Sequence, residues 1–115
     1  MRRGEIRWVD LDPTRGSESD KRRPAVIVSN DGANATAARL NRGVITVVPV
    51  TGNVTQVFPF QVLLPAGTAG LEMDSKVQAE QVRSVSVHRV SSALGVLSTL
   101  LMDQVDEALR LHLSL

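Results

Sequence analysis

The chain has 115 residues, a length that fits one domain, and its 13 basic and 12 acidic residues leave a formal net charge of +1. So small a charge produces no overall field that would indicate a nucleic-acid partner. Cysteine and tyrosine are absent, and there are only two histidines and one tryptophan. This composition excludes a disulfide scaffold, a structural zinc site, a thiol nucleophile and a broad aromatic platform for bases. A hydrophobic share of 43% is enough for a packed core.

The charge is unevenly distributed along the chain. Residues 1–42 carry nine Lys or Arg and six Asp or Glu, a net of +3, whereas residues 43–115 carry four and six, a net of −2. The N-terminal part therefore has a modest basic bias.

No targeting or membrane segment is expected. The opening sequence MRRGEIRW lacks the apolar core of a signal peptide. Residues 43–71 contain no charge, but prolines, glycines and amides interrupt them before the roughly 20 apolar residues that a spanning helix needs. This stretch is typical of buried strands joined by turns, and we expect a cytoplasmic protein that does not enter a membrane.

Five short stretches have the pattern of β-strands, with turn-forming residues between them. They lie at residues 5–11, 25–28, 44–50, 59–64 and 77–87. So many short strands predict a small barrel or rolled sheet.

Helical patterns follow at residues 33–40, which are rich in alanine, and at residues 98–113. Ser98 is the predicted N-cap of the second helix, and Asp106 and Arg110 are predicted to pair. A helical stripe runs along this segment through Leu101, Val105, Ala108 and His112.

The strongest chemical signal is the polar segment GSESDKRRP at residues 16–24, which brings three cations to the start of a buried strand. Pro24 restricts Arg23 to extended backbone, so the guanidinium has a fixed position where it can bind a phosphate or oxyanion. Lys21 and Arg22 lie further into the loop. An ordinary solvated charge run in a hairpin loop explains the same composition, which on its own favours that interpretation.

Two more segments carry polar groups at strand ends. Thr51 follows a buried strand in the sequence PVTGN, although threonine in this place is usually a turn former. Residues 74–83 include Glu80, Gln81 and Arg83, which an exposed sheet face also explains.

Motifs for metal, nucleotide or serine chemistry are missing from the sequence. His88 and His112 lie on different predicted elements with no carboxylate or cysteine at ligand spacing. We therefore expect no metal site and no cofactor.

Five segments, in order and at suitable spacing, resemble the MazF/PemK family of toxin endoribonucleases from toxin–antitoxin pairs. They are RGEIRWVDL followed by Pro13, GSE with RP and the strand that ends SND, PVT, DS with EQVRS, and MDQVDEAL. The resemblance implies a mainly β fold over residues 1–115, a small SH3-like β-barrel with a C-terminal helix, that works as a homodimer. It also implies metal-independent cleavage of single-stranded RNA, restrained by an antitoxin that blocks the RNA groove.

Carried over residue by residue, the resemblance assigns Arg23 and Thr51 as the catalytic pair. It puts five further residues near the RNA groove: Glu18, Asn30, Ser75, Glu80 and Gln81. We add Lys21, from the charged loop, as an RNA-binding cation. Gly52 departs from the family, many of whose members have Ser there. This departure removes one hydroxyl from the site or loosens the turn that holds Thr51.

In the reaction that the resemblance implies, the ribose 2′-OH attacks its own phosphate and leaves a 2′,3′-cyclic phosphate and a 5′-OH end. The substrate supplies the nucleophile, so the protein needs none. Arg23 is a poor base because a guanidinium stays protonated near neutrality, and it would act with Thr51 on the charged phosphate oxygens. The general base is unassigned, and Glu18 is a candidate if it reaches the 2′-OH.

Two alternatives share the same barrel. CcdB-like toxins bind and poison DNA gyrase through a tryptophan near the C-terminus, whereas the only tryptophan here is Trp8. A catalytically silent RNA-binding barrel is the other alternative, and the presence of both Arg23 and Thr51 argues against it.

Overall fold

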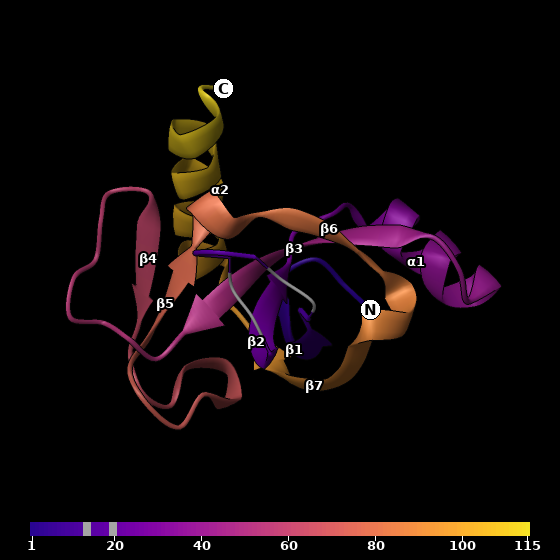
Figure 1. The fold of residues 1–115 in the computed structure, drawn as a ribbon, viewed down its shortest axis with the longest axis horizontal. Helices are drawn as coiled ribbons and strands as arrows, with labels where there is room; N and C mark the ends of the chain where they lie inside the picture. The colour runs from indigo at the N-terminus through magenta and orange to yellow at the C-terminus, as the bar shows by residue number, and fades with distance from the viewer. Residues whose placement is uncertain (13–14, 19–20) are drawn as a thin grey trace.

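The computed structural model describes residues 1–12, 15–18 and 21–115, and Figure 1 shows the arrangement of their elements. Pro13 of the family pattern and two residues of the charged loop, Ser19 and Asp20, lie outside the described residues. The strands are β1 (Glu5–Asp10), β2 (Arg22–Ile27), β3 (Val44–Thr51), β4 (Gln61–Leu64), β5 (Ser75–Gln78), β6 (Arg83–Ser86) and β7 (Val90–Val96). The helices are α1 (Asp31–Leu40) and α2 (Thr99–Leu113), and the 3₁₀ turns are η1 (Thr68–Gly70), η2 (Ala79–Gln81) and η3 (Val87–Arg89).

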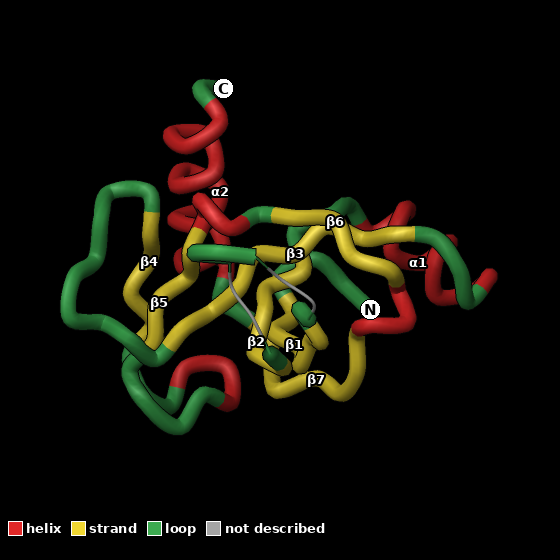
Figure 2. Tube along the Cα trace, viewed as in Figure 1, coloured by secondary structure: helices red, strands yellow, loops and turns green. Residues whose placement is uncertain are grey.

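The strands form an antiparallel sheet in the order β4-β5-β3-β2-β1-β7, and β6 pairs with β3 beside this path. β3 is central because its first half pairs with β6 and its end pairs with β5, at Thr51↔Lys76. The predicted mainly β fold with a C-terminal helix is confirmed, as Figure 2 shows. The predicted barrel is not closed, however, because within the described residues the edge strands β4 and β7 do not pair with each other.

Two hydrophobic clusters lie on the two faces of the sheet. Because successive strand residues face opposite sides, β1 directs Ile6 into the first cluster and Val9 into the second. The first cluster includes Val105 and Ala108 of α2, which are buried, and the second includes Ala37 of α1. The helices thus extend the two clusters separately, and they lie at different ends of the sheet in Figure 1.

The predicted C-terminal helix and its cap are confirmed. Ser98 accepts the backbone N–H three residues on, at 3.2 Å. The predicted pair of Asp106 with Arg110 is wrong, because Asp106 pairs with Arg3 and Arg110 pairs with Glu107, each at 2.5 Å. At 15 residues α2 is the longer of the two α-helices, and no described helix has the length and apolarity to cross a membrane.

Two segments differ from the expected strand pattern. The single strand predicted at residues 77–87 is wrong, because η2 interrupts it and separates β5 from β6. β7 has no counterpart among the predicted strands. All seven of its residues are exposed or half-buried, and their sequence, VSSALGV, lacks the alternation of apolar and polar residues that predicts a strand.

Candidate functional site

Arg23 and Thr51 lie at the adjacent ends of two paired strands. The antiparallel register of β2 with β3 runs from Ile27↔Val47 to Ala25↔Pro49. Arg23 and Thr51 each lie two residues beyond this last pair, at the same end of the sheet. Because side chains repeat every second residue along a strand, both then face the same side of the sheet.

A hollow of about 390 Å³ lies at these strand ends. Arg23, Thr51 and Ser75, three of the eight predicted site residues, line it. It also has an apolar part, formed by side chains from β1, β7 and the segment at residues 70–73. The hollow therefore combines a guanidinium, hydroxyls and apolar walls in one concave surface, which is typical of small-ligand sites.

Two glycines allow the wall at residues 68–73 to pack closely against β7. A Cβ on Gly70 would lie 2.3 Å from the carbonyl oxygen of Leu94, and Gly70 has a φ of +82°. A Cβ on Gly95 would lie 2.5 Å from backbone atoms of Ala69. Both contacts are with backbone, so any larger residue would push this wall away from the sheet.

Thr51 is the last residue of β3, and its side chain begins the turn that follows. Its Oγ1 accepts the backbone N–H of Asn53 at 3.3 Å. Because the oxygen is the acceptor in this bond, the hydroxyl proton can be donated to a ligand. A Cβ on Gly52 would lie 3.2 Å from Sδ of Met73, so this glycine leaves room for the methionine beside Thr51.

A buried lysine lies beside Thr51, on the neighbouring strand β5. Lys76 is the register partner of Thr51 and is 8% exposed. Its ammonium donates to the carbonyl oxygen of Gln56 at 2.6 Å and lies 6.0 Å from the ring centroid of Phe58. Lys76 thereby ties the segment that follows Thr51 to β5. It is absent from the predicted site residues, since nothing in the local sequence pattern distinguishes a buried lysine from a solvated one.

Ser75 is buried, and its hydroxyl donates to the carbonyl oxygen of Met73 at 3.0 Å. This bond fixes the last turn before β5 and so shapes the side of the hollow where Met73 lies. The contact does not by itself give Ser75 a role toward RNA.

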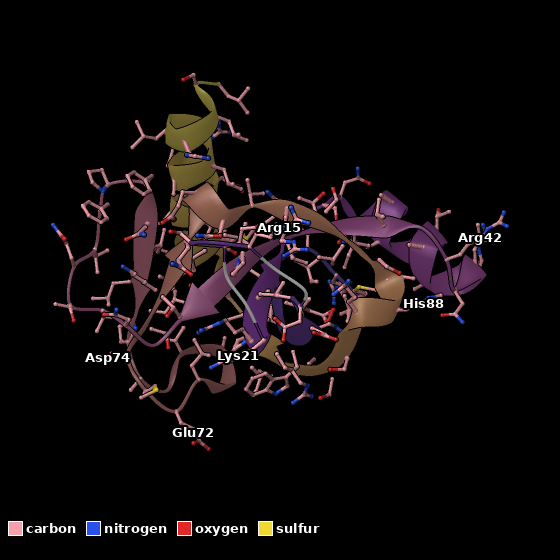
Figure 3. The ribbon with its side chains drawn as sticks, viewed as in Figure 1. Arg15, Lys21, Arg42, Glu72, Asp74 and His88 are labelled. Atoms are coloured by element: carbon pink, nitrogen blue, oxygen red, sulfur yellow. The ribbon has the colours of Figure 1, made fainter. Side chains whose placement is uncertain are left out.

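The predicted loop residues Glu18 and Lys21 lie outside the lining of the hollow. Glu18 and Arg15 close a turn, in which the carboxylate of Glu18 accepts the N–H of Arg15 at 2.9 Å and the N–H of Glu18 donates to the Arg15 carbonyl at 3.2 Å. Lys21 has a φ of 63°, and its N–H donates to Asp12 at 2.9 Å. In Figure 3 Lys21 and Glu72 lie in the lower part of the view, away from Arg42 and His88 on its right.

The predicted residue Gln81 connects this loop with η2. Its Nε2 donates to the carbonyl oxygen of Ser17 at 3.0 Å. Glu80, its neighbour, accepts from Nε2 of Gln61 at 2.6 Å, while its other oxygen is buried and unpaired within the described residues. These two hydrogen bonds tie η2 to the segment of Ser17 and to Gln61 of β4.

Asn30, predicted to lie near the RNA groove, is the N-cap of α1 in the structure. Its side chain caps α1 by accepting the N–H of Ala33 at 2.8 Å. Residues 30–32, with the sequence NDG, have a composition typical of a turn. In the structure, however, they form the N-cap and the start of this helix. The capping explains the asparagine without any ligand.

Trp8 and Arg22 also line the hollow, although neither is among the predicted site residues. The guanidinium carbon of Arg22 lies 4.8 Å from the Trp8 ring centroid. The charged loop signal included Arg22, but only the strand register shows that it reaches the tryptophan. Within the described part of the chain, no three histidine or acidic side chains gather closely enough to hold a metal ion.

The chain is similar in sequence and fold to known toxins. A family model described as PemK-like, MazF-like toxin of type II toxin–antitoxin system matches residues 2–113. Endoribonuclease MazF9 of Mycobacterium tuberculosis is 63% identical over 115 residues, covering 100% of this chain and 98% of that protein. The crystal structure of MazF from Deinococcus radiodurans superposes with a TM-score of 0.83 at 27% identity, over 100% of this chain and 97% of that one. An endoribonuclease in complex with its cognate antitoxin, from a mycobacterial species, has the same fold, with a TM-score of 0.77 at 22% identity over 100% and 96% of the two chains.

Proposed function

Because the chain belongs to the PemK-like, MazF-like family of toxins from type II toxin–antitoxin systems, we propose that it is an endoribonuclease that cuts single-stranded RNA at short sequences without a metal ion. The register that brings Arg23 and Thr51 to adjacent strand ends beside a hollow carries this proposal. The endoribonuclease activity in the name of the 63% identical relative supports it. In this proposal residues 1–115 act as one toxin domain.

The proposed reaction is an attack of the ribose 2′-OH on the adjacent phosphorus. A P–O2′ bond forms, the P–O5′ bond breaks, and the products carry a 2′,3′-cyclic phosphate and a 5′-OH. The 2′-OH loses its proton to a base and the leaving 5′ oxygen gains one. The protein has to hold the phosphate in line with the 2′-OH and stabilise the added negative charge.

Arg23 and Thr51 supply this stabilisation in our proposal. A guanidinium offers two parallel N–H donors that match two phosphate oxygens. The Thr51 hydroxyl, whose oxygen already accepts from Asn53, offers a third donor. These donors do not have to move during the reaction, which is the main source of electrostatic catalysis in such sites.

The general base stays open in this proposal. Glu18 is the candidate, and its carboxylate accepts from the N–H of Arg15. To act as the base, it has to come within hydrogen-bond reach of the 2′-OH when RNA binds. Lys21, on the same loop, and Gln81, which holds Ser17, would then contact RNA together with Glu18. Asn30, Ser75 and Glu80 complete the proposed RNA surface.

We further propose that the protein works as a homodimer and is restrained by a cognate antitoxin in the cytoplasm. Several leucines of the C-terminal region are strongly exposed, with Leu100 at 69% and Leu115 at 85%, and offer apolar surface for another chain. An antitoxin segment that competes with RNA for the same cations should be acidic and apolar. Light scattering of the toxin with and without a candidate antitoxin measures both assemblies.

The decisive experiment incubates the purified chain with a long RNA in EDTA and maps the ends of the products. We expect cuts at one short sequence, with 2′,3′-cyclic phosphate and 5′-OH ends, and no cutting of DNA of the same sequence because DNA lacks the 2′-OH. Activity that EDTA abolishes and Mg²⁺ restores would identify a metal nuclease. Uncut RNA together with gyrase-dependent DNA breaks would support a CcdB-like toxin.

Two variants test the assigned residues in the same assay. Arg23→Ala should abolish detectable cleavage, and Thr51→Val, which keeps the side-chain shape but removes the hydroxyl, should lower kcat by about 10²-fold or more. Circular dichroism checks that both variants fold. Parental cleavage rates in a folded Arg23→Ala variant would show that the site assignment is wrong.

A further inference from the structure

Arg22 is held in a defined orientation at the wall of the hollow. In the register of β1 with β2, Arg22 lies opposite Asp10 and Pro24 lies opposite Trp8, so Arg22 and Trp8 share one face of the sheet. The guanidinium lies over the Trp8 ring at 4.8 Å, and its Nη2 donates to Oγ of Ser91 at 3.3 Å. Ser91 in turn donates to the carbonyl oxygen of Trp8 at 3.2 Å.

The charge of Arg22 is not neutralised within the part of the chain that the structure describes. Arg3, Arg7 and Arg110 each form an ion pair with a carboxylate, whereas Arg22 pairs with none of the described carboxylates. Asp10, its cross-strand neighbour, accepts the N–H of Asp12 at 3.1 Å instead. An exposed arginine usually samples many rotamers, but here the tryptophan and the serine limit that freedom while the charge stays available.

Arg22 and Arg23 point to opposite faces of β2 because they are consecutive strand residues. Arg23 extends the face of Ala25, and Arg22 lies on the face of Trp8 and Pro24. Both residues line the same hollow at the strand end. Two guanidiniums that start from opposite faces of the strand are better placed to bind two neighbouring phosphates than to bind a single phosphate.

We propose that Arg22 binds a phosphate of the RNA next to the one that is cut, and that Trp8 and Ser91 orient it for this contact. This inference rests on the proposed function, because it assumes an RNA chain whose reacting phosphate lies at Arg23 and Thr51. Arg22 is a binding residue in this scheme and Trp8 is a positioning residue. The second phosphate contact adds binding energy and sets the direction of the RNA chain without touching the reacting phosphate.

The first test measures the salt dependence of RNA binding. The probe is an RNA that contains the mapped cleavage sequence with a 2′-deoxy sugar at the cut, so it binds but does not react. For Arg22→Ala we expect a Kd about tenfold higher, since a charge-assisted hydrogen bond to phosphate is lost. The slope of log Kd against log salt should fall by about 0.7, the value for one phosphate on a single strand.

The matched controls are Arg22→Lys and Arg42→Ala. Lysine keeps the charge, so Arg22→Lys should restore the salt slope, with an affinity between those of the parent and the alanine variant. Arg42 is also an exposed arginine but lies at the α1 end of the molecule, away from Lys21 and Glu72 in Figure 3. Arg42→Ala therefore removes the same charge from the chain and should leave Kd and slope unchanged.

The second test separates binding from chemistry on cleavable RNA. Arg22→Ala should raise KM about tenfold and change kcat by less than about twofold, whereas Arg23→Ala should lose kcat. Trp8→Leu should raise KM about twofold to fivefold in the parent but have no further effect in the Arg22→Ala background. Thermal unfolding checks that the Trp8 variant folds, and Ser91→Ala offers a second way to release the arginine.

The outcomes distinguish this inference from the proposed function. If the parent chain does not cut RNA, the proposed function fails. If the parent cuts RNA but Arg22→Ala keeps the parental Kd and salt slope, only the role of Arg22 is overturned. That role is also overturned if Arg22→Ala weakens binding of an antitoxin and not of RNA, or if Arg42→Ala changes the slope equally.

Discussion

Arg3 links α1, α2 and the segment that follows β2, so its removal gives a measurable prediction. Its Nε donates to the carbonyl oxygen of Val28 at 2.9 Å, and its Nη2 lies 2.5 Å from Oδ1 of Asp106 in α2. Its backbone N–H donates to Asp31 at 2.7 Å, a bond that a side-chain substitution leaves in place. We predict that Arg3→Ala lowers the free energy of unfolding by about 1–2 kcal/mol because α2 loses its polar link to the sheet.

The magnitude follows from the exposure of the two partners. The side chains of Arg3 and Asp106 are 35% and 25% exposed, so solvent screens the ion pair and its contribution is about 0.5 kcal/mol. The hydrogen bond to the Val28 carbonyl adds about 1 kcal/mol. Removing one partner of a fully buried pair would cost several times as much, because the other charge is left uncompensated, whereas a fully solvated pair contributes nearly nothing.

Urea denaturation followed by circular dichroism measures the effect, in a cycle of Arg3→Ala, Asp106→Ala and the double variant. The coupling energy should be about 0.5 kcal/mol and should fall as salt is added. Arg110→Ala is the control, because Arg110 and Glu107 are 57% and 73% exposed and their pair should contribute only about 0.3 kcal/mol. Equal losses for Arg3→Ala and Arg110→Ala, or no coupling in the cycle, would refute the reasoning.

Two further predictions concern the site and the N-terminal strand. Gly52→Ala and Gly52→Ser both put a Cβ 3.2 Å from Sδ of Met73, which is 62% exposed and can move, so each should change stability by less than about 1 kcal/mol. The serine also adds a hydroxyl beside the proposed catalytic pair, so we expect Gly52→Ser to cut RNA faster than Gly52→Ala, and equal rates would exclude a role for the hydroxyl. Burial raises the pKa of Glu5, but the N–H of Arg2, the guanidinium of Arg7 and the N-terminal ammonium together outweigh burial and hold the pKa below its usual 4.5. The ionised carboxylate therefore adds stability above pH 4.5 that is lost as the pH falls through the lower folded-state value. Glu5→Gln should reduce the loss of unfolding free energy as the pH falls from about 7 to about 3, measured by urea denaturation. An unchanged pH dependence would contradict the assignment.

The elements that the sequence predicts well are those specified by local chemistry. Pro24 and the β-branched residues after it indicate where β2 runs, and the helical period with Ser98 indicates α2. β7 has no such signal, because it is held by long-range pairing with β1 and leaves most of its side chains in solvent. The break at η2 is also hidden, because Val77, Ala79 and Val85 continue an alternating pattern across a turn.

In the candidate site, too, local chemistry predicts some features, and strand pairing between distant segments determines the others. Pro24 indicates an extended Arg23 from sequence alone, but the arrival of Arg23 and Thr51 at the same end of the sheet depends on which residues of β2 and β3 pair. The cap formed by Asn30 follows from helix chemistry, yet the sequence around it does not reveal the cap because the same residues are typical of turns. The burial of Lys76 depends on strands distant in sequence, so no local pattern predicts it.

The distribution of ion pairs accounts for the proposed binding of RNA by a chain whose net charge is only +1. Arg3, Arg7 and Arg110 are neutralised by carboxylates away from the hollow, where they hold elements together. Arg22 is instead held by an aromatic ring and a hydroxyl, it forms no ion pair with a described carboxylate, and it lines the hollow. The net charge counts the ion-paired arginines and Arg22 alike, so it underestimates the positive potential where β2 begins and β3 ends. If few cations carry the binding, the total salt slope should be shallow, and the loss of Arg22 alone should remove a large share of it.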